Sequence, residues 1–155
     1  MSARIKPASK SFKRVWTVSR YPKQRSAVAQ ALAAQSGLEV KRIDLSTVVS
    51  RYIGETEKNL ERIFAEAEGN DWLLFFDEAD ALFGKRTEVK DSHDRYANQD
   101  VSYFLHQLQN STSSVLVASR RKHAIDPALL RKLRISTITS LPLPPVRPKK
   151  IRKPK

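Results

Sequence analysis

The sequence predicts an α/β fold, a three-layer α/β/α sandwich built on a mainly parallel sheet. Three observations predict it. Short apolar strands alternate with helical segments along the chain. The run WLLFF at residues 72–76 is apolar throughout, as in strands buried on both faces of a parallel sheet. This run ends abruptly in Asp77-Glu78, an acidic pair at the carboxyl end of a strand, where open α/β sheets bind ligands.

The first half of the chain follows a strand–helix–strand order. Residues 14–18 (RVWTV) are β-branched and aromatic, which predicts a strand, and a turn is expected at residues 19–22 because Pro22 cannot donate to a ladder. Strong helix formers fill residues 25–36, and Gly37 stands where a helix C-cap needs a left-handed residue. Alternating apolar residues predict a second strand over residues 38–45.

The second half repeats the alternation. Residues 55–68 predict an amphipathic helix, residues 84–98 a charged loop, and residues 99–109 another helix. The segment SVLVAS at residues 114–119 is a second candidate for a buried strand, so right-handed βαβ units on a parallel sheet are expected. The apolar face of the amphipathic helix would consist of Leu60, Ile63, Phe64 and Ala67.

Composition indicates one folded domain. The chain has 155 residues, of which 40% are hydrophobic and 29% charged. We expect a basic lead at residues 1–12, a core at residues 13–141 and a proline-rich basic tail at residues 142–155 that is extended and disordered. No apolar window of about 18 residues and no secretory h-region are seen, so a cytoplasmic protein without a membrane partner is expected.

Cysteine count and charge exclude some chemistry and favour other partners. With no cysteine, disulfides, thiolate zinc sites and cysteine nucleophiles are excluded. The net charge of +13 is concentrated at the ends: residues 1–25 carry eight Lys and Arg and no acid, and residues 101–155 carry twelve against one acid. Such ends favour nonspecific, salt-sensitive binding of nucleic acid or another polyanion, or are simply solvated.

The acidic pair after the apolar strand is typical of the Walker B arrangement. There the Asp holds Mg²⁺ through water and the Glu polarises an attacking water, roles that Asp77 and Glu78 fit. Taken alone, an acidic pair after a strand is often only a solvated turn.

Three ordered segments supply the context. RYIGETEKNLERIFAEAE at residues 51–68, LLFFDEADALFGKR at residues 73–86 and IDPALLRKLR at residues 125–134 resemble, in order and spacing, the AAA-family (AAA+) P-loop ATPase core. The resemblance covers Val15 to Leu143. More narrowly, residues 77–98 resemble the bacterial AAA ATPases of contractile phage-tail-like particles.

The resemblance implies a hexameric ring, homo- or hetero-oligomeric, that acts on a polypeptide. The segment matching the family's first pore loop contains Tyr52, Ile53 and Gly54, and Tyr52 would grip the polypeptide. The alternative is that Tyr52 packs on its own domain. Arg131 and Arg134 match the arginine fingers that reach a neighbour's nucleotide, or they are ordinary surface arginines.

ATP and Mg²⁺ are the cofactors that the resemblance implies, but the matching loop departs from the family pattern. Residues 19–26 (SRYPKQRS) replace GxxxxGK[ST] without a single glycine, and Pro22 removes a backbone donor. Arg25 stands in place of the phosphate-binding lysine, and Ser26 keeps the hydroxyl that would share Mg²⁺ with Asp77. We expect nucleotide affinity to be greatly weakened.

Two further departures concern the sensor and the lid. The sensor position after the strand at 114–119, usually Asn, is Arg120, which cannot accept a hydrogen bond from the attacking water. The helical lid that follows the core in this family has no counterpart, so the core is expected to be truncated. These losses put hydrolysis and ring assembly in question.

The sequence therefore favours an AAA-type ATPase module of a protein-remodelling ring, with catalysis by Glu78, Arg131 and Arg134 weak or lost. Such a chain is either a pseudoenzyme that serves a mixed ring or a truncated relic. The alternative is a non-enzymatic interaction protein whose basic tails bind an acidic partner or nucleic acid. A metal-dependent hydrolase is the third hypothesis, and its ligand set is poor: Asp77, Glu78, Asp80 and His93.

Overall fold

The computed structural model describes residues 14–84 and 92–138. Five parallel strands form one sheet in the order β2-β3-β4-β1-β5. The strands are β1 (Arg14–Val18), β2 (Glu39–Asp44), β3 (Trp72–Asp77), β4 (Ser114–Ser119) and β5 (Ile135–Ile138). The expected basic lead and proline-rich tail lie outside the described residues.

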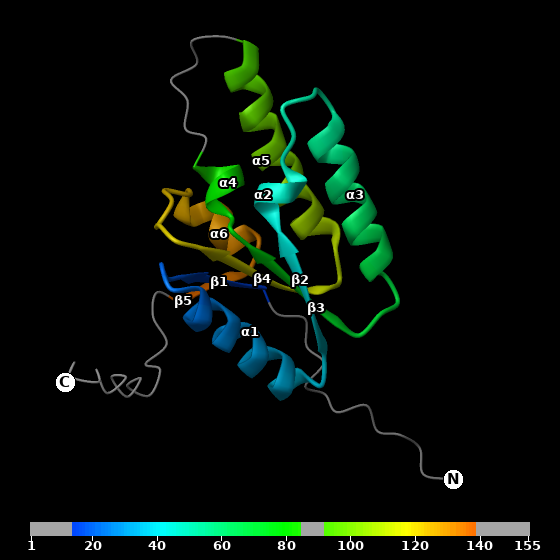
Figure 1. The fold of residues 1–155 in the computed structure, drawn as a ribbon, viewed down its shortest axis with the longest axis vertical. Helices are drawn as coiled ribbons and strands as arrows, with labels where there is room; N and C mark the ends of the chain where they lie inside the picture. The colour runs from blue at the N-terminus through cyan, green and yellow to red at the C-terminus, as the bar shows by residue number, and fades with distance from the viewer. Residues whose placement is uncertain (1–13, 85–91, 139–155) are drawn as a thin grey trace, which may run out of the picture.

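Helices cover both faces of the sheet (Figure 1), so the predicted three-layer α/β/α sandwich is confirmed. α1 lies on one face, and α3 and α5 pack together on the other. The helices are α1 (Pro22–Ser36), α2 (Leu45–Val48), α3 (Glu55–Ala67), α4 (Asp80–Phe83), α5 (Ser92–Asn110) and α6 (Pro127–Lys132).

Helix α1 begins at Pro22 rather than at Arg25, so the expected turn is shorter than predicted. Proline is favoured in the first helical turn because its fixed φ suits the helix and its missing N–H would have no intrahelical partner. The amides of Gln24 and Arg25 both donate to the Tyr21 carbonyl, which closes this first turn. Gly37 ends the helix with a φ of 66°, the left-handed C-cap that the sequence predicted.

Helix α5 begins at Ser92, so the prediction of a loop over residues 84–98 is wrong for residues 92–98. No glycine or proline interrupts residues 92–109, and a helix that is anchored further along can continue through polar residues. Residues 85–91 lie outside the described part. The short elements α2, α4, α6 and β5 were not anticipated.

Strand β3 is buried on both faces, as predicted. Phe75 packs in the cluster under α1, while Phe76 packs in the cluster under α3 and α5. The Phe76 ring meets Phe104 edge-on at 5.0 Å between centroids and lies 5.4 Å from Phe64. This packing fixes the carboxyl end of β3, and with it Asp77. Among the residues that the structure describes, no helix is long and apolar enough to cross a membrane.

Candidate functional site

Asp77 and Glu78 lie at the carboxyl edge of the sheet, beside the segment that follows β1 and the first turn of α1. Asp77 is the last residue of β3 and is 1% exposed. Glu78 has a φ of 57°, a left-handed backbone that is uncommon for glutamate. Its amide donates to Asp77 Oδ1 at 2.8 Å, so the two acids are locked to each other locally.

Both carboxylate oxygens of Asp77 accept hydrogen bonds from arginines. Arg25 Nε donates to Oδ1 at 2.7 Å, and Arg42 Nη2 and Nε donate to Oδ2 at 2.8 and 3.2 Å. These charge-assisted bonds are short and well directed. Arg42 projects from β2, the strand next to β3, and no sequence argument had assigned it to the site.

Glu78 is held from two sides. Arg25 Nη2 donates to Oε1 at 2.9 Å, and Arg120 donates to Oε1 and Oε2 at 3.0 and 3.1 Å. The hydrogen bond and charge of Glu78 raise the pKa of Arg120 above its ordinary value. Arg120, which matches the family's sensor position, thus donates to the glutamate directly.

Arg25 is the centre of this cluster. It is fully buried, at 0% exposure, and comes from the first turn of α1. Its Nη1 donates to the Ser19 carbonyl at 2.8 Å, so each of its three nitrogens has an acceptor. The fork of one guanidinium therefore ties β1, α1 and β3 together at the sheet edge.

The segment between β1 and α1 does not form a phosphate cradle. Only Ser19–Tyr21 separates the two elements, and none of residues 19–26 has a positive φ. The Ser19 amide donates to Ser119, the Tyr21 amide donates to the Ser19 hydroxyl, and the amides of Gln24 and Arg25 donate to Tyr21. A phosphate-binding loop instead points several free amides at one anion.

These residues do not fit a magnesium-bound nucleotide. Ser26 is exposed, and both oxygens of Asp77 already accept from guanidinium groups. Mg²⁺ needs unhindered oxygen ligands and is repelled by neighbouring cations. Among the side chains that the structure describes, no group of three or more His, Asp or Glu residues could hold a metal ion. The side chain of His93 lies outside this description.

Asp80 anchors the loop that follows β4. The amides of Arg120 and Arg121 donate to it at 2.6 and 3.1 Å, and His123 Nε2 lies 2.8 Å from its Oδ1. Burial raises the pKa of Asp80, but these hydrogen bonds together outweigh burial and leave the pKa below its ordinary value. No sequence pattern had indicated the pairing of Asp80 with His123.

The segment Arg51–Gly54 projects into solvent, as predicted. Tyr52 is 65% exposed and Ile53 is 73% exposed, which makes them large apolar side chains with little contact to their own domain. Gly54 has a φ of 79° and lies just before α3. The alternative that Tyr52 packs on its own domain does not agree with this exposure.

Arg131 and Arg134 lie away from Asp77 and Glu78. Arg131 is exposed in the last turn of α6, and Arg134 is exposed just before β5, with a φ of 56°. Burial and then the charge of Arg134 lower the pKa of Arg14, which lies at the amino end of β1. Arg134 is therefore at the amino edge of the sheet, opposite the acidic pair, and cannot serve the site of its own chain.

Comparisons with known proteins identify the family. Residues 25–143 match the model of the "ATPase family associated with various cellular activities (AAA)". The chain is 34% identical over 122 residues to ATPase family gene 2 protein of Schizosaccharomyces pombe, covering 77% of this chain and 15% of that protein. It is 32% identical over 128 residues to the proteasome-activating nucleotidase of Aeropyrum pernix, covering 79% of this chain and 31% of that one.

A third relative is the probable 26S proteasome regulatory subunit 6B of Caenorhabditis elegans, 30% identical over 132 residues, with 82% of this chain and 32% of that protein covered. The chain thus spans at most about a third of the length of these relatives. The family match covers more than half of this chain, and the fold agrees with it. The chain belongs to the AAA family of ATPases.

Proposed function

We propose that this chain is an AAA-type module of a ring-forming, protein-remodelling assembly, and that its own ATP turnover is weak or lost. The observation that carries the second part is the ion pair of the buried Arg25 with Asp77, 2.7 Å between Nε and Oδ1. In the family, a bound Mg²⁺ ion faces the acid that matches Asp77, and the phosphates of the nucleotide face the cation that matches Arg25. Here guanidinium groups already neutralise the acids, so a metal would gain little from binding them.

Charge balance supports the same proposal. Arg25, Arg42 and Arg120 face Asp77 and Glu78, so the cluster carries three positive charges against two negative ones. Displacing Arg25 would leave a buried guanidinium without acceptors, which costs several kcal/mol. A nucleotide would have to offset this cost without the backbone cradle that normally binds its phosphates.

The exposed segments support a role in an assembly. Tyr52 and Ile53 are suited to gripping a passing polypeptide, and Arg131 and Arg134 are free to reach a neighbouring subunit. Relatives named as proteasome regulatory subunits and as a proteasome-activating nucleotidase share this module. The proposed partners are therefore other AAA subunits, identical or different, and a polypeptide substrate.

The narrower likeness to ATPases of contractile phage-tail-like particles stays a proposal, since much of residues 77–98 lies outside the description. The remaining alternative to a pseudoenzyme that serves a mixed ring is a truncated relic. Co-purification with an intact AAA subunit, lost in an Arg131→Ala, Arg134→Ala double variant, would favour the serving subunit, and a chain that enters no ring would favour the relic.

The experiment is a titration of the purified chain with a fluorescent ATP analogue and Mg²⁺, alongside Asp77→Ala and a variant that restores the family loop, Ser19→Gly with Gln24→Gly and Arg25→Lys. We expect no saturable binding to the natural sequence up to millimolar nucleotide. The restored loop should bind, because Lys reaches a phosphate while the glycines free the backbone.

Saturable binding by the natural sequence that disappears in Asp77→Ala would contradict the proposal. A Glu78→Gln variant separates binding from turnover: if the natural chain hydrolyses Mg·ATP and this variant does not, the arginine cluster opens during the reaction and the proposal fails. Lys23→Ala, an exposed change in the same helical turn, serves as the matched control.

A second candidate function is attachment through the basic ends to an acidic partner or to nucleic acid. The uneven distribution of the net charge of +13 favours it. Binding through the tail should fall steeply with salt and disappear on removal of residues 142–155. Affinity that survives both changes would rule this candidate out.

A further inference from the structure

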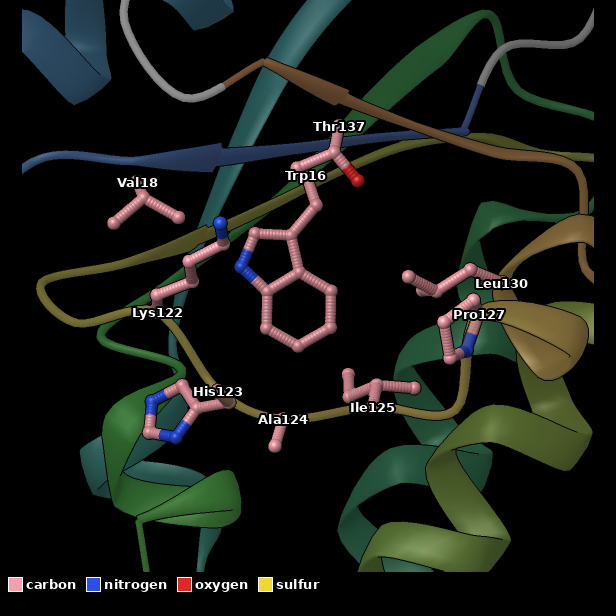
Figure 2. A pocket seen from close by; sticks show the side chains of 9 residues that line it. All are labelled: Trp16, Val18, Lys122, His123, Ala124, Ile125, Pro127, Leu130 and Thr137. Atoms are coloured by element: carbon pink, nitrogen blue, oxygen red, sulfur yellow. The ribbon is translucent and has the colours of Figure 1, made fainter.

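A cavity of about 450 Å³ opens on the sheet face opposite α1, between β1, β5 and the segment that leads from β4 into α6 (Figure 2). The indole of Trp16 forms its back wall, with Ile125, Pro127 and Leu130 on one side and Lys122 with His123 at the other end. This volume lies within the range of pockets that bind ligands.

The lining makes the cavity selective for an apolar group. Trp16 Nε1 donates to the Ser119 hydroxyl at 3.0 Å, so the indole has no free donor to offer a ligand. Its ring is held in place by Phe83 at 4.8 Å between centroids. Ile125, Pro127 and Leu130 add only carbon to the wall, so a large aliphatic or aromatic side chain would be the best occupant.

A second, polar hollow of about 600 Å³ adjoins the first and shares Lys122, His123 and Ala124 with it. Two of its charged groups are already engaged: Arg120 binds Glu78, and the carboxylate of Asp80 accepts from the loop. Arg121 and Lys122 are exposed, and no ion pair of theirs is found in the described part of the chain. The hollow therefore presents two available cations.

We propose that these two hollows form a docking site for an acidic peptide segment of a partner protein. One large apolar side chain of the segment enters the Trp16 cavity, and flanking carboxylates pair with Arg121 and Lys122. Arg120 lines the second hollow, but it is engaged by Glu78, and neither Asp77 nor Arg25 lines either hollow, so the proposed docking does not require a bound nucleotide.

Charge complementarity selects this occupant over the chain's own tail. Residues 142–155 contain six Lys and Arg and no acid, so Arg121 and Lys122 would repel them. An acidic segment gains from both cations, and the apolar cavity adds affinity that does not depend on salt.

Intrinsic fluorescence provides the assay. The chain has two tryptophans, so Trp72→Phe leaves Trp16 as the single reporter in the full-length protein. The probe is the acetylated, amidated peptide EELEE, compared with EEAEE and KKLKK and with a synthetic peptide of residues 141–150. We expect a saturable change of Trp16 emission with EELEE. EEAEE should bind at least tenfold more weakly, and KKLKK should not bind.

Matched variants assign the effect to the two hollows. Leu130→Phe enlarges a side chain that points toward Trp16 (Figure 2) and should weaken EELEE at least tenfold, whereas Ala128→Leu, on exposed α6 outside the cavity, should not. Arg121→Glu with Lys122→Glu should abolish binding, and Lys58→Glu on exposed α3 should have little effect. Circular dichroism and the thermal midpoint confirm that each variant is folded.

Three results would overturn the proposal. They are equal affinity for EELEE and EEAEE, unchanged EELEE binding in a folded Leu130→Phe variant, and tighter binding of the tail peptide than of EELEE. The last would assign the cavity to the chain's own residues. Because nucleotide is absent from this assay, its failure leaves the titration of the ATP analogue unaffected.

Discussion

The acidic edge of the sheet and the segment Arg51–Gly54 differ in whether their side chains find partners within the chain. At the sheet edge the carboxylates of Asp77 and Glu78 are bound by arginines of the same chain. At Arg51–Gly54 two large apolar side chains, Tyr52 and Ile53, remain exposed to solvent. The charges of the first region are paired within the chain, whereas the second region exposes apolar surface that is available to a partner molecule.

This difference separates the two halves of an AAA module. Under the proposed function, ion pairs that hold α1, β2 and β3 together take the place of the chemistry that depends on a bound nucleotide. Tyr52, Arg131 and Arg134, which are proposed to serve the polypeptide and the ring, lie elsewhere on the fold and do not depend on those ion pairs. Substitutions in the first region should therefore affect stability, and those in the second should affect association alone.

The largest expected effect is that of Arg25→Ala. Removing the guanidinium leaves the buried Asp77 with fewer partners, and breaking a buried pair by deleting one partner costs about 3–5 kcal/mol. The free energy of unfolding should fall by that amount in a urea titration. A functional phosphate-binding residue at this position would instead change stability little in the absence of nucleotide.

Arg25→Met combined with Asp77→Leu sharpens this result. If the pair acts as a structural unit, the double variant should recover much of the lost stability, since apolar residues of similar size can replace a buried ion pair. Additive losses from the two single changes would show that they act independently.

An intermediate effect is expected from pH through Asp80. Its pKa is lowered in the folded chain, so it contributes stability that is present above its unfolded pKa and is lost as the pH falls through the folded value. Asp80→Asn should therefore lower the free energy of unfolding at about pH 7, and the difference from the natural chain should shrink below about pH 4. A difference that grows on acidification would contradict the assignment.

A smaller effect is expected from Glu78→Gln. Glu78 is partly exposed and its second partner, Arg120, has a side chain that is 55% exposed, so solvent screens much of this interaction. Loss of stability should stay within about 1 kcal/mol, measured beside Arg25→Ala under the same conditions. A loss as large as that of Arg25→Ala would mean that Glu78, not Asp77, is the main partner of the buried arginine.

The smallest effect on stability should come from Tyr52→Ala. Exposed substitutions away from special contacts usually change the free energy of unfolding by no more than about 0.5 kcal/mol. The thermal midpoint should stay unchanged, while binding to an unfolded polypeptide in an assembled ring should weaken. A clear drop in the thermal midpoint would indicate that Tyr52 packs against its own domain.

Most of the fold followed from the sequence because its strands have strong patterns. The apolar runs of β3 and β4 and the helix formers of α1 were each sufficient to predict an element. The start of α1 was misplaced because Pro22 was assigned to a turn after the strand, although proline is a good first helical residue. Strand β5 has only four residues, too few for a clear period.

The site was predicted in part. Asp77 and Glu78 stood out because the acidic pair follows an apolar run within ordered segments that resemble an AAA core, and Arg25 was found at the lysine position by counting along the loop. Arg42 was missed because an arginine in a strand of alternating polarity is normally expected to face solvent. Only the pairing of β2 with β3 brings it to Asp77. His123 likewise depends on a contact 43 residues away in sequence.

The most direct test of the central claim observes the Arg25 side chain itself. In a ¹⁵N-labelled sample, the Nε–H resonance of Arg25 can be assigned by its loss in Arg25→Lys, and recorded with and without millimolar Mg·ATP. We expect a resonance that is protected from solvent exchange and whose shift stays the same when nucleotide is added. A saturable shift, or loss of protection on adding Mg·ATP, would show that Arg25 leaves Asp77 for a phosphate, and the proposed loss of turnover would then be wrong.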